Sequence, residues 1–333
     1  MMAYIYSVIG KNMQSFEQLL HAFNAVFEKS HFPEQPASLY QPAAYFLSMG
    51  GKRVRPVAVL MGNELFDDIV ADSWQVATAI ELFHNFTLIH DDIMDKAPLR
   101  RGMETVHTRY GEPTALLAGD VMLVVAYDYL NKVRSPQVHR LIRIFNETAK
   151  AVCEGQQLDM DFEKQGQVSM ADYLHMITLK TSVLLAASLQ LGAVLGGASE
   201  GNQEHIYAFG KNLGIAFQVQ DDYLDAFGDP QKFGKQVGGD ILANKKTFLL
   251  IKALETASPY DAARLTALLS SQPADKVEQV LAIYRNCGVD QWARSLKAEY
   301  YDKALQHLEA VAVVSRRKKP LEDLAAFLLQ REY

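Results

Sequence analysis

The most constraining feature of this sequence is a pair of aspartate clusters, each set inside an apolar helical pattern. The first is Leu88-Ile-His-Asp-Asp-Ile-Met-Asp95 and the second is Gln220-Asp-Asp-Tyr-Leu-Asp225. On a helix the first and last acidic positions of such a cluster lie one turn apart on one face, where two like charges cost about 0.2–0.5 kcal/mol. Something must compensate this repulsion, and the repetition of the arrangement disfavours an ordinary solvated acidic face.

The donor atoms of both clusters are carboxylate oxygens, which favour a hard divalent cation. Mg²⁺ usually binds through a few carboxylates and keeps positions open for substrate phosphates. The candidate ligands are Asp91, Asp92 and Asp95 in the first cluster and Asp221, Asp222 and Asp225 in the second. The sequence therefore predicts a magnesium site, with the two clusters as two walls of it.

Composition places the chain among globular proteins that can bury a large core: 333 residues, 49% hydrophobic and 22% charged. The formal net charge of -6 gives no reason to expect a nucleic acid partner. Two cysteines, Cys153 and Cys287, are too few for a disulfide framework, so we expect a reducing, cytoplasmic compartment. The beginning of the chain predicts no signal peptide, and residues 182–198 are expected to form a buried core helix rather than a transmembrane segment.

Apolar residues recur at three and four positions over most of the chain, and alternating Val/Ile/Thr runs are scarce. This pattern predicts a nearly all-α fold. Expected helices cover residues 16–27, 39–48, 119–133, 136–155, 173–192 and 203–227, with further helices from residue 245 onward. A helix capped by Asp72 or Ser73 carries the first cluster and ends before Pro98. The glycine- and lysine-rich segment 232–240 is expected to be a mobile loop and part of a lid.

Basic residues near the two clusters supply cations for an anionic substrate. Arg100 and Arg101 follow the first cluster directly, and planar guanidinium groups suit phosphate oxygens. Further basic groups are Lys52, Arg53 and Arg55 in one turn, Lys180 beside Thr181, and Lys235, Lys245 and Lys246 after the second cluster. We interpret Arg53, Lys246 and the run 316–319 as exposed surface charges. His84, two helical turns before Asp91, reads as an ordinary core histidine on its own.

Taken together, the motifs resemble the polyprenyl synthetase family, the trans-isoprenyl diphosphate synthases, and their short-chain type. They are Gly50-Gly-Lys-Arg-Val-Arg-Pro56, Asp91-Asp-Ile-Met-Asp95 with Arg100-Arg-Gly102, Gly155-Gln156 with Asp159, Lys180-Thr181, Phe217-Gln-Val-Gln-Asp-Asp-Tyr-Leu-Asp225, and Gly239-Asp240 through Lys245. The resemblance implies a single domain over residues 1–333, an all-α bundle around a central active-site cavity, and a homodimer.

The family joins an allylic diphosphate to isopentenyl diphosphate, head to tail, and releases pyrophosphate. The resemblance implies that Asp91, Asp95 and Asp221 hold three Mg²⁺ on the allylic diphosphate, with Asp92, Asp222 and Asp225 in support. It implies that Arg100, Lys180, Lys235 and Lys245 grip the same diphosphate, with Thr181 and Gln218 close to the reacting carbon. Lys52, Arg55, His84 and Arg101 are implied to hold the diphosphate of isopentenyl diphosphate without metal.

The resemblance also bears on product length, through the residues five and four positions before Asp91. Phe86 looks like a block against long products, and Thr87 is smaller than the second aromatic residue of many farnesyl-stage enzymes. The pair favours geranylgeranyl diphosphate, with farnesyl diphosphate as the alternative, and Phe83 can shift the length either way. Without the resemblance, the preferred interpretation of Phe86 is an ordinary core aromatic residue.

Two other functional classes stay open at this point. A terpene cyclase on a similar helical bundle would need a second metal motif of the Asn/Ser/Glu type, which Asp221-Asp-Tyr-Leu-Asp225 is not. A non-catalytic subunit of a heteromeric prenyl synthase would be expected to have lost acidic or basic motifs, whereas both kinds are complete here. Such a subunit would be inactive alone and active with a partner.

Overall fold

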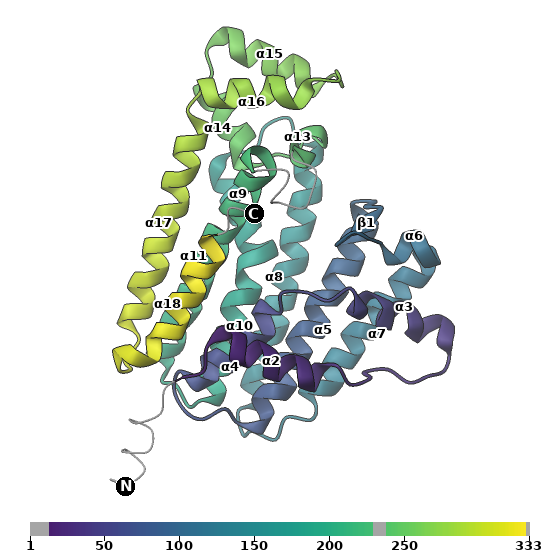
Figure 1. The fold of residues 1–333 in the computed structure, drawn as a ribbon, viewed down its shortest axis with the longest axis vertical. Coiled ribbons are helices and arrows are strands. Elements are labelled where there is room, and N and C mark those ends of the chain that lie inside the picture. Colours follow the sequence, from purple (N-terminus) through teal and green to yellow (C-terminus); the bar gives the residue numbers. More distant parts are fainter. Residues whose placement is uncertain (1–12, 229–237, 331–333) are drawn as a thin grey trace. The chain divides into compact units, whose positions relative to one another are not determined.

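The structure, a computed structural model, describes residues 13–228 and 238–330. Its elements (Figure 1) are α2 (Phe16–Phe27), α3 (Ala37–Ser48), α4 (Val54–Glu64), α5 (Ala71–Met94), β1 (Leu99–Arg100), β2 (Met103–Glu104), α6 (Val106–Tyr110), α7 (Glu112–Leu130), α8 (Val138–Lys164), α9 (Met170–Ile177), the π-helical turn η1 (Thr178–Ser182), α10 (Val183–Leu195), α11 (Glu200–Phe227), α13 (Gly239–Leu242), α14 (Phe248–Thr256), α15 (Pro259–Leu269), α16 (Lys276–Asn286), α17 (Val289–Ala310) and α18 (Ser315–Leu329). Within the described ranges the only strands form a two-residue hairpin. The predicted all-α fold is confirmed.

The chain divides into two compact units, each assembled from three separate segments. Unit 1 comprises Met1–Asn146, Ala187–Ile206 and Ala312–Pro320, and unit 2 comprises Glu147–Ala186, Tyr207–Val311 and Leu321–Tyr333. The first aspartate cluster and the Gly50 turn belong to unit 1, whereas the second cluster and Lys180 belong to unit 2.

Unit 1 is built around α5, the helix that carries the first aspartate cluster. Its N-terminal half is buried on nearly every side, and it packs on α4 and α7, with α5 and α7 side by side in Figure 1. Two glycines bring α4 and α10 into backbone contact: a side chain at Gly62 would overlap the carbonyl of Leu189, and one at Gly192 would overlap that of Val59. This packing fixes the helix from which Asp91 and Asp95 project.

Unit 2 has a second apolar core, formed mainly by α9, α14, α16 and α17 around the C-terminal part of α11. Tyr173, Phe248, Leu265 and Ile283 are each almost completely buried there. The α15–α16 pair packs against α14 and α13, as the green end of Figure 1 shows. The core therefore supports both α11 and the turn that follows it.

Several helix boundaries differ from the predicted ones. The helix expected to end at Gly155 continues to Lys164, because Gly155 is a close-packing position: a side chain there would overlap the backbone nitrogen of Lys180. The helix predicted over 173–192 is interrupted by η1, where the Ser182 hydroxyl donates to the carbonyl of Ile177 at 3.3 Å. The helix of the first cluster begins after Val70 rather than Asp72 or Ser73, and it ends before Pro98 as predicted.

Two helical stretches are long and apolar enough to cross a membrane by length and composition alone, Glu112–Leu130 and Met170–Leu195. The second is 72% buried, as expected for a core helix. The first is only 39% buried, and its exposed side carries Leu116, Leu117, Val124 and Tyr127. The exposed side of α7 is therefore unusually apolar.

Candidate active site

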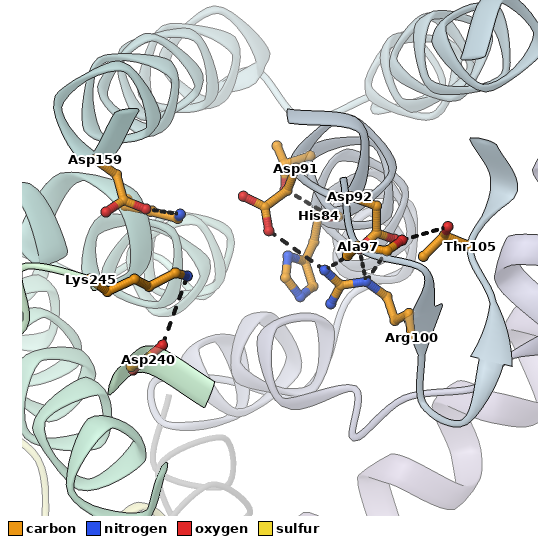
Figure 2. A network of polar contacts seen from close by, with 11 residues as sticks. His84, Asp91, Asp92, Ala97, Arg100, Thr105, Asp159, Asp240 and Lys245 are labelled. Carbon is orange, nitrogen blue, oxygen red and sulfur yellow. Dashed lines mark hydrogen bonds and ion pairs between the residues drawn. The ribbon is translucent and has the colours of Figure 1, made fainter. Parts of the chain in front are cut away.

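The first aspartate cluster is locked to Arg100 within unit 1 (Figure 2). The Arg100 Nε donates to Asp92 Oδ1 and Oδ2 at 2.8 and 2.9 Å, and its Nη2 lies 2.7 Å from Asp92 Oδ1 and 3.5 Å from Asp91 Oδ2. Burial raises the pKa of the Asp92 carboxyl, and the hydrogen bond from Arg100 lowers it in part. Asp92 is thus the buried anchor of Arg100, while Asp91, one position earlier, keeps a partly exposed carboxylate.

A tight hairpin places Arg100 opposite α5. Strands β1 and β2 pair Leu99 with Glu104 and Arg100 with Met103, and the turn between them needs positive φ at Arg101 and Gly102. The hydroxyl of Thr105 donates to the carbonyl of Ala97 at 2.8 Å, which ties the base of the hairpin together (Figure 2). The direction of the Arg100 side chain is therefore fixed by backbone geometry as well as by Asp92.

The second arginine of the hairpin turns toward the glycine-rich segment before α4. Arg101 donates to the carbonyl of Gly50. A Cβ atom at Gly51 would lie only 3.2 Å from the Arg101 guanidinium nitrogens. Gly50 and Gly51 have φ values of 74° and 154°, a conformation that side chains disfavour. Glycine is needed here so that Arg101 can approach the turn that carries Lys52.

Arg55 and His84 meet beside this turn. The Arg55 Nη1 lies 3.0 Å from His84 Nε2, and burial lowers the pKa of Arg55 to about 10. Burial, followed by the charges of Arg55 and Arg101, holds the pKa of His84 well below its usual range. His84 is therefore neutral, with Nε2 accepting from Arg55. The structure brings Arg55, His84 and Arg101 into one basic cluster.

The interpretation of Arg53 as an exposed surface charge is wrong. Its side chain is 7% exposed, pairs with the buried Glu81 and lies over the ring of Phe27 at 4.7 Å. The run 316–319 is also not simply exposed, because Arg317 and Lys318 are buried, and Arg317 donates to the carbonyl of Glu64. These cations have structural partners that a local sequence pattern does not reveal.

In unit 2, the Lys180 ammonium is bound to Asp159. The Lys180 Nζ lies 2.6 Å from Asp159 Oδ2, and Figure 2 labels Asp159. Asp159 stands one helical turn after Gly155, where α8 touches the backbone of η1. The close approach at Gly155 therefore fixes the position along α8 at which Lys180 reaches the Asp159 carboxylate.

The second aspartate cluster contains a chain of hydrogen bonds that the sequence analysis missed. Tyr173, from α9, donates to Asp222 Oδ2 at 2.6 Å, and Gln218 Nε2 donates to Asp222 Oδ1 at 2.8 Å. Thr181 then donates to Gln218 Oε1 at 3.1 Å. Burial and the charge of Asp240 raise the pKa of Asp222 well above its usual range. Asp222 thus orients Gln218 and, through it, Thr181. No motif in the sequence marks Tyr173 for this contact.

Asp225, the last member of the cluster, holds the turn that follows α11. Its Oδ2 accepts from the backbone nitrogen of Asp240 at 3.0 Å, and its carbonyl accepts from that of Gly238 at 2.6 Å. Lys245 Nζ lies 4.0 Å from Asp240 Oδ1 (Figure 2). Burial, followed by the charge of Asp225, raises the pKa of Asp240 to about 6, and Lys245 opposes this rise. Burial and the neighbouring carboxylate therefore both favour the neutral form of Asp240.

This arrangement of carboxylates and cations agrees with the comparisons to known proteins. The sequence profile of polyprenyl synthetases matches residues 36–287. The chain belongs to the polyprenyl synthetase family. It is accordingly a prenyltransferase, and the family predicted from the sequence motifs is confirmed.

Relatives of known name cover nearly the whole polyprenyl synthetase chain. A short chain isoprenyl diphosphate synthase from Methanothermobacter thermautotrophicus is 37% identical over 90% of this chain and 92% of its own. A geranylgeranyl pyrophosphate synthase from Geoglobus acetivorans is 37% identical over 90% of this chain and 93% of its own. A crystal structure of a geranylgeranyl pyrophosphate synthase superposes with a TM-score of 0.92 and 42% identity, covering 96% of this chain and all of that chain.

The carboxylates of this polyprenyl synthetase suit Mg²⁺, which shares its coordination shell with water and phosphate. They suit less well a metal ion that is enclosed by protein side chains alone. Among the described residues there is no group of three or more His, Cys, Asp or Glu side chains that could enclose a metal ion. Mg²⁺ commonly uses only one or two carboxylates and completes its shell with water and substrate phosphates. The carboxylate oxygens of Asp91 and Asp95 in unit 1, and those of Asp221 in unit 2, are the hard donors that such a coordination shell uses.

The remaining predicted positions are placed as follows. Lys52 is exposed, and Lys235 lies outside the described residues, as does most of the segment 232–240. The Phe86 ring is half-buried against His90 and Phe83, with ring centroids 4.8 and 5.7 Å apart. Thr87 donates its hydroxyl to the carbonyl of His84 at 2.8 Å, within its own helix.

Proposed function

We propose that this prenyltransferase carries out Mg²⁺-dependent, head-to-tail condensation of isopentenyl diphosphate with allylic diphosphates, with geranylgeranyl diphosphate as its product. The observation that carries the proposal is the presence of two different cationic groups in unit 1. Arg100 is paired with the carboxylates of Asp91 and Asp92, whereas Arg55 and Arg101 gather around neutral His84. The first group suits a diphosphate that arrives with Mg²⁺, and the second suits a diphosphate bound without metal.

The proposed reaction begins when the allylic carbon–oxygen bond breaks and the diphosphate leaves with the electron pair. Asp91, Asp95 and Asp221 would hold the Mg²⁺, and the metal would supply charge neutralisation for this poor leaving group. Additional cations for the departing oxygens come from Arg100, Lys180, Lys245 and, outside the described residues, Lys235. The isopentenyl double bond attacks the allylic cation, and the proton lost from the new chain goes to pyrophosphate.

The remaining site residues orient these groups rather than transfer charge. Asp92 holds Arg100, Asp222 holds Gln218 and through it Thr181, and Asp225 holds the backbone of the turn that leads to Lys245. We assign Gln218 and Thr181 to the surroundings of the reacting carbon. Preorganised polar groups of this kind stabilise developing charge without reorganising during the reaction.

Product length provides a test of the part assigned to Phe86. We expect Phe86→Ala to lengthen the product by at least one isoprene unit, because it removes a half-buried ring from the α5 surface that His90 and Phe83 share. Thr87→Phe has the opposite effect, because it adds a large side chain, and is expected to shorten the product to fifteen carbons. Chromatography of the dephosphorylated products measures both. An unchanged length in Phe86→Ala rejects Phe86 as the floor.

We further propose that the exposed apolar side of α7 is covered by a second copy of this chain. Leu116, Leu117, Val124 and Tyr127 are 42%, 57%, 59% and 39% exposed on one helix. Apolar surface of this extent is uncommon on a monomer, and a helix face can pair with itself about a two-fold axis. The compartment we propose is the cytoplasm.

The proposed dimer predicts a specific effect of charge on α7. Leu117→Glu is expected to raise the dimer dissociation constant at least about a hundredfold, because it would bury an unpaired carboxylate in the interface. Sedimentation velocity over a dilution series measures this. The control, Tyr260→Glu, alters a 71% exposed side chain on α15 and should leave the constant unchanged. A wild-type chain that is monomeric at micromolar concentration contradicts the proposal.

The condensation itself is tested by incorporation of labelled isopentenyl diphosphate. We expect incorporation only when an allylic diphosphate and Mg²⁺ are both present, and loss of incorporation with excess EDTA. Release of pyrophosphate from an allylic diphosphate without isopentenyl diphosphate would point instead to a terpene cyclase. A chain that is inactive alone and active only with an added prenyl synthase subunit would support the non-catalytic alternative.

A further inference from the structure

Unit 2 contains a lysine that is fully buried, an uncommon state for this residue type. Lys276 is the first residue of α16, its relative exposure is 0%, and its Nζ donates to Asn244 Oδ1 at 2.7 Å. Desolvation lowers the pKa of this ammonium. Lys276 belongs to none of the cationic groups assigned above to a diphosphate, so its burial calls for a different explanation.

Its partner, Asn244, makes a hydrogen bond with both the oxygen and the nitrogen of its side-chain amide. Asn244 has a left-handed φ of 54°, its Oδ1 accepts from Lys276, and its Nδ2 donates to the carbonyl of Leu269 at 3.1 Å. Asparagine adopts the left-handed conformation more readily than most residues other than glycine, and contacts from its surroundings can hold it there. The two hydrogen bonds from α15 and α16 supply that support.

Other contacts fasten the same turn to the α15–α16 pair. Gln272 Nε2 donates to the carbonyl of Leu242 at 3.3 Å. At Gly238, a Cβ would lie 2.6 Å from Val277 Cγ1, so α16 packs directly against the start of α13. The segment from Gly238 to Asn244 is therefore held along one side by the residues that begin or precede α16.

The opposite side of this segment is held by the second aspartate cluster. Asp225 accepts from the backbone nitrogens of Gly238 and Asp240, as described above. Lys245 follows Asn244 directly, and its own nitrogen donates to the carbonyl of Asp240 at 2.9 Å. The left-handed turn at Asn244 thus returns the chain so that the Lys245 ammonium comes within 4.0 Å of Asp240.

We infer that Lys276 and Asn244 are positioning residues that set the direction of Lys245 toward the allylic diphosphate. This inference rests on the proposed function, because it takes Lys245 as a ligand of that diphosphate. Lys276 itself contacts no substrate in this account. It acts through Asn244, whose backbone conformation decides where the side chain of the next residue points.

A double-mutant cycle tests the inference through steady-state kinetics. In the wild-type background, Lys276→Met should raise the KM for the allylic diphosphate about tenfold and leave the KM for isopentenyl diphosphate within about twofold. In a Lys245→Ala background, the same substitution should change the allylic KM by less than about twofold, because the group it positions is already gone. Lys303→Met, on α17, removes a 45% exposed lysine and is the matched control.

The outcomes separate this inference from the proposed function. A wild-type chain without condensation activity overturns both. If the wild type is active but Lys276→Met raises the allylic KM equally in the two backgrounds, or does not raise it at all, only the positioning role is overturned. If Lys276→Met fails to fold, Asn244→Gly replaces it: glycine keeps the left-handed backbone, removes both side-chain hydrogen bonds, and should give the same selective rise in the allylic KM.

Discussion

Asp91→Asn and Asp221→Asn are each expected to lower kcat at least about a thousandfold, with the fold preserved. Each change removes one negative charge from a carboxylate assigned to Mg²⁺ and keeps its shape. A bound metal contributes several kcal/mol of charge stabilisation at the leaving group, and each 1.36 kcal/mol corresponds to about tenfold in rate. The measurement is initial-rate incorporation of labelled isopentenyl diphosphate at saturating substrate, with circular dichroism to verify folding.

Asp302→Asn provides the control for this first prediction. Asp302 is an exposed aspartate of α17 in unit 2, so its substitution also changes the net charge by one without touching either cluster. We expect its kcat to remain within about twofold of wild type. If Asp91→Asn or Asp221→Asn retained a tenth or more of the wild-type kcat, that aspartate would not be a metal ligand in the reaction.

The second large effect is expected at Arg55, to which we assign a different role from that of its neighbour Arg53. Arg55→Met should raise the KM for isopentenyl diphosphate about a hundredfold and change the KM for the allylic diphosphate by no more than about twofold. Hydrogen bonds to charged groups contribute about 1.5–3 kcal/mol, and a guanidinium can make two to one diphosphate. Steady-state kinetics with each substrate varied in turn measures the two constants.

Arg53→Met serves as the matched comparison two positions earlier. It leaves Glu81, whose side chain is 4% exposed, buried without its guanidinium partner, so the free energy of unfolding should fall by about 3–5 kcal/mol. The folded fraction should bind isopentenyl diphosphate as the wild type does. Urea denaturation measures the stability. An Arg53→Met enzyme of unchanged stability, or an Arg55→Met enzyme of unchanged KM, contradicts this division of roles.

The contrast between these arginines illustrates what local sequence can predict. The apolar period of three and four residues predicts most helices, because each must bury one face, and the acidic spacing predicts the carboxylates of α5 and α11. The sequence predicts an exposed Arg53 because the partners of this residue, Glu81 and Phe27, stand 28 and 26 positions away. A charged residue is buried only when the fold supplies such partners, and periodicity does not report them.

Positioning residues are the other part that the sequence does not predict. No recognisable motif marks Tyr173 or Lys276. Their contacts form only where α9 packs on α11 and where α16 packs on the turn that follows α13. The sequence predicts a helix end at Gly155, whereas in the structure this glycine permits contact between α8 and the backbone of Lys180. Such roles depend on distances between elements far apart in sequence, which are set by packing rather than by local propensity.

The most direct test of the proposed condensation is the identity of its product. Purified protein is incubated with Mg²⁺, labelled isopentenyl diphosphate and, in separate reactions, dimethylallyl, geranyl or farnesyl diphosphate, and the products are resolved by chain length after dephosphorylation. We predict a discrete twenty-carbon prenyl alcohol from each starter. A discrete fifteen-carbon product would keep the mechanism and contradict the assigned length, whereas no condensation with any starter would contradict the proposed function itself.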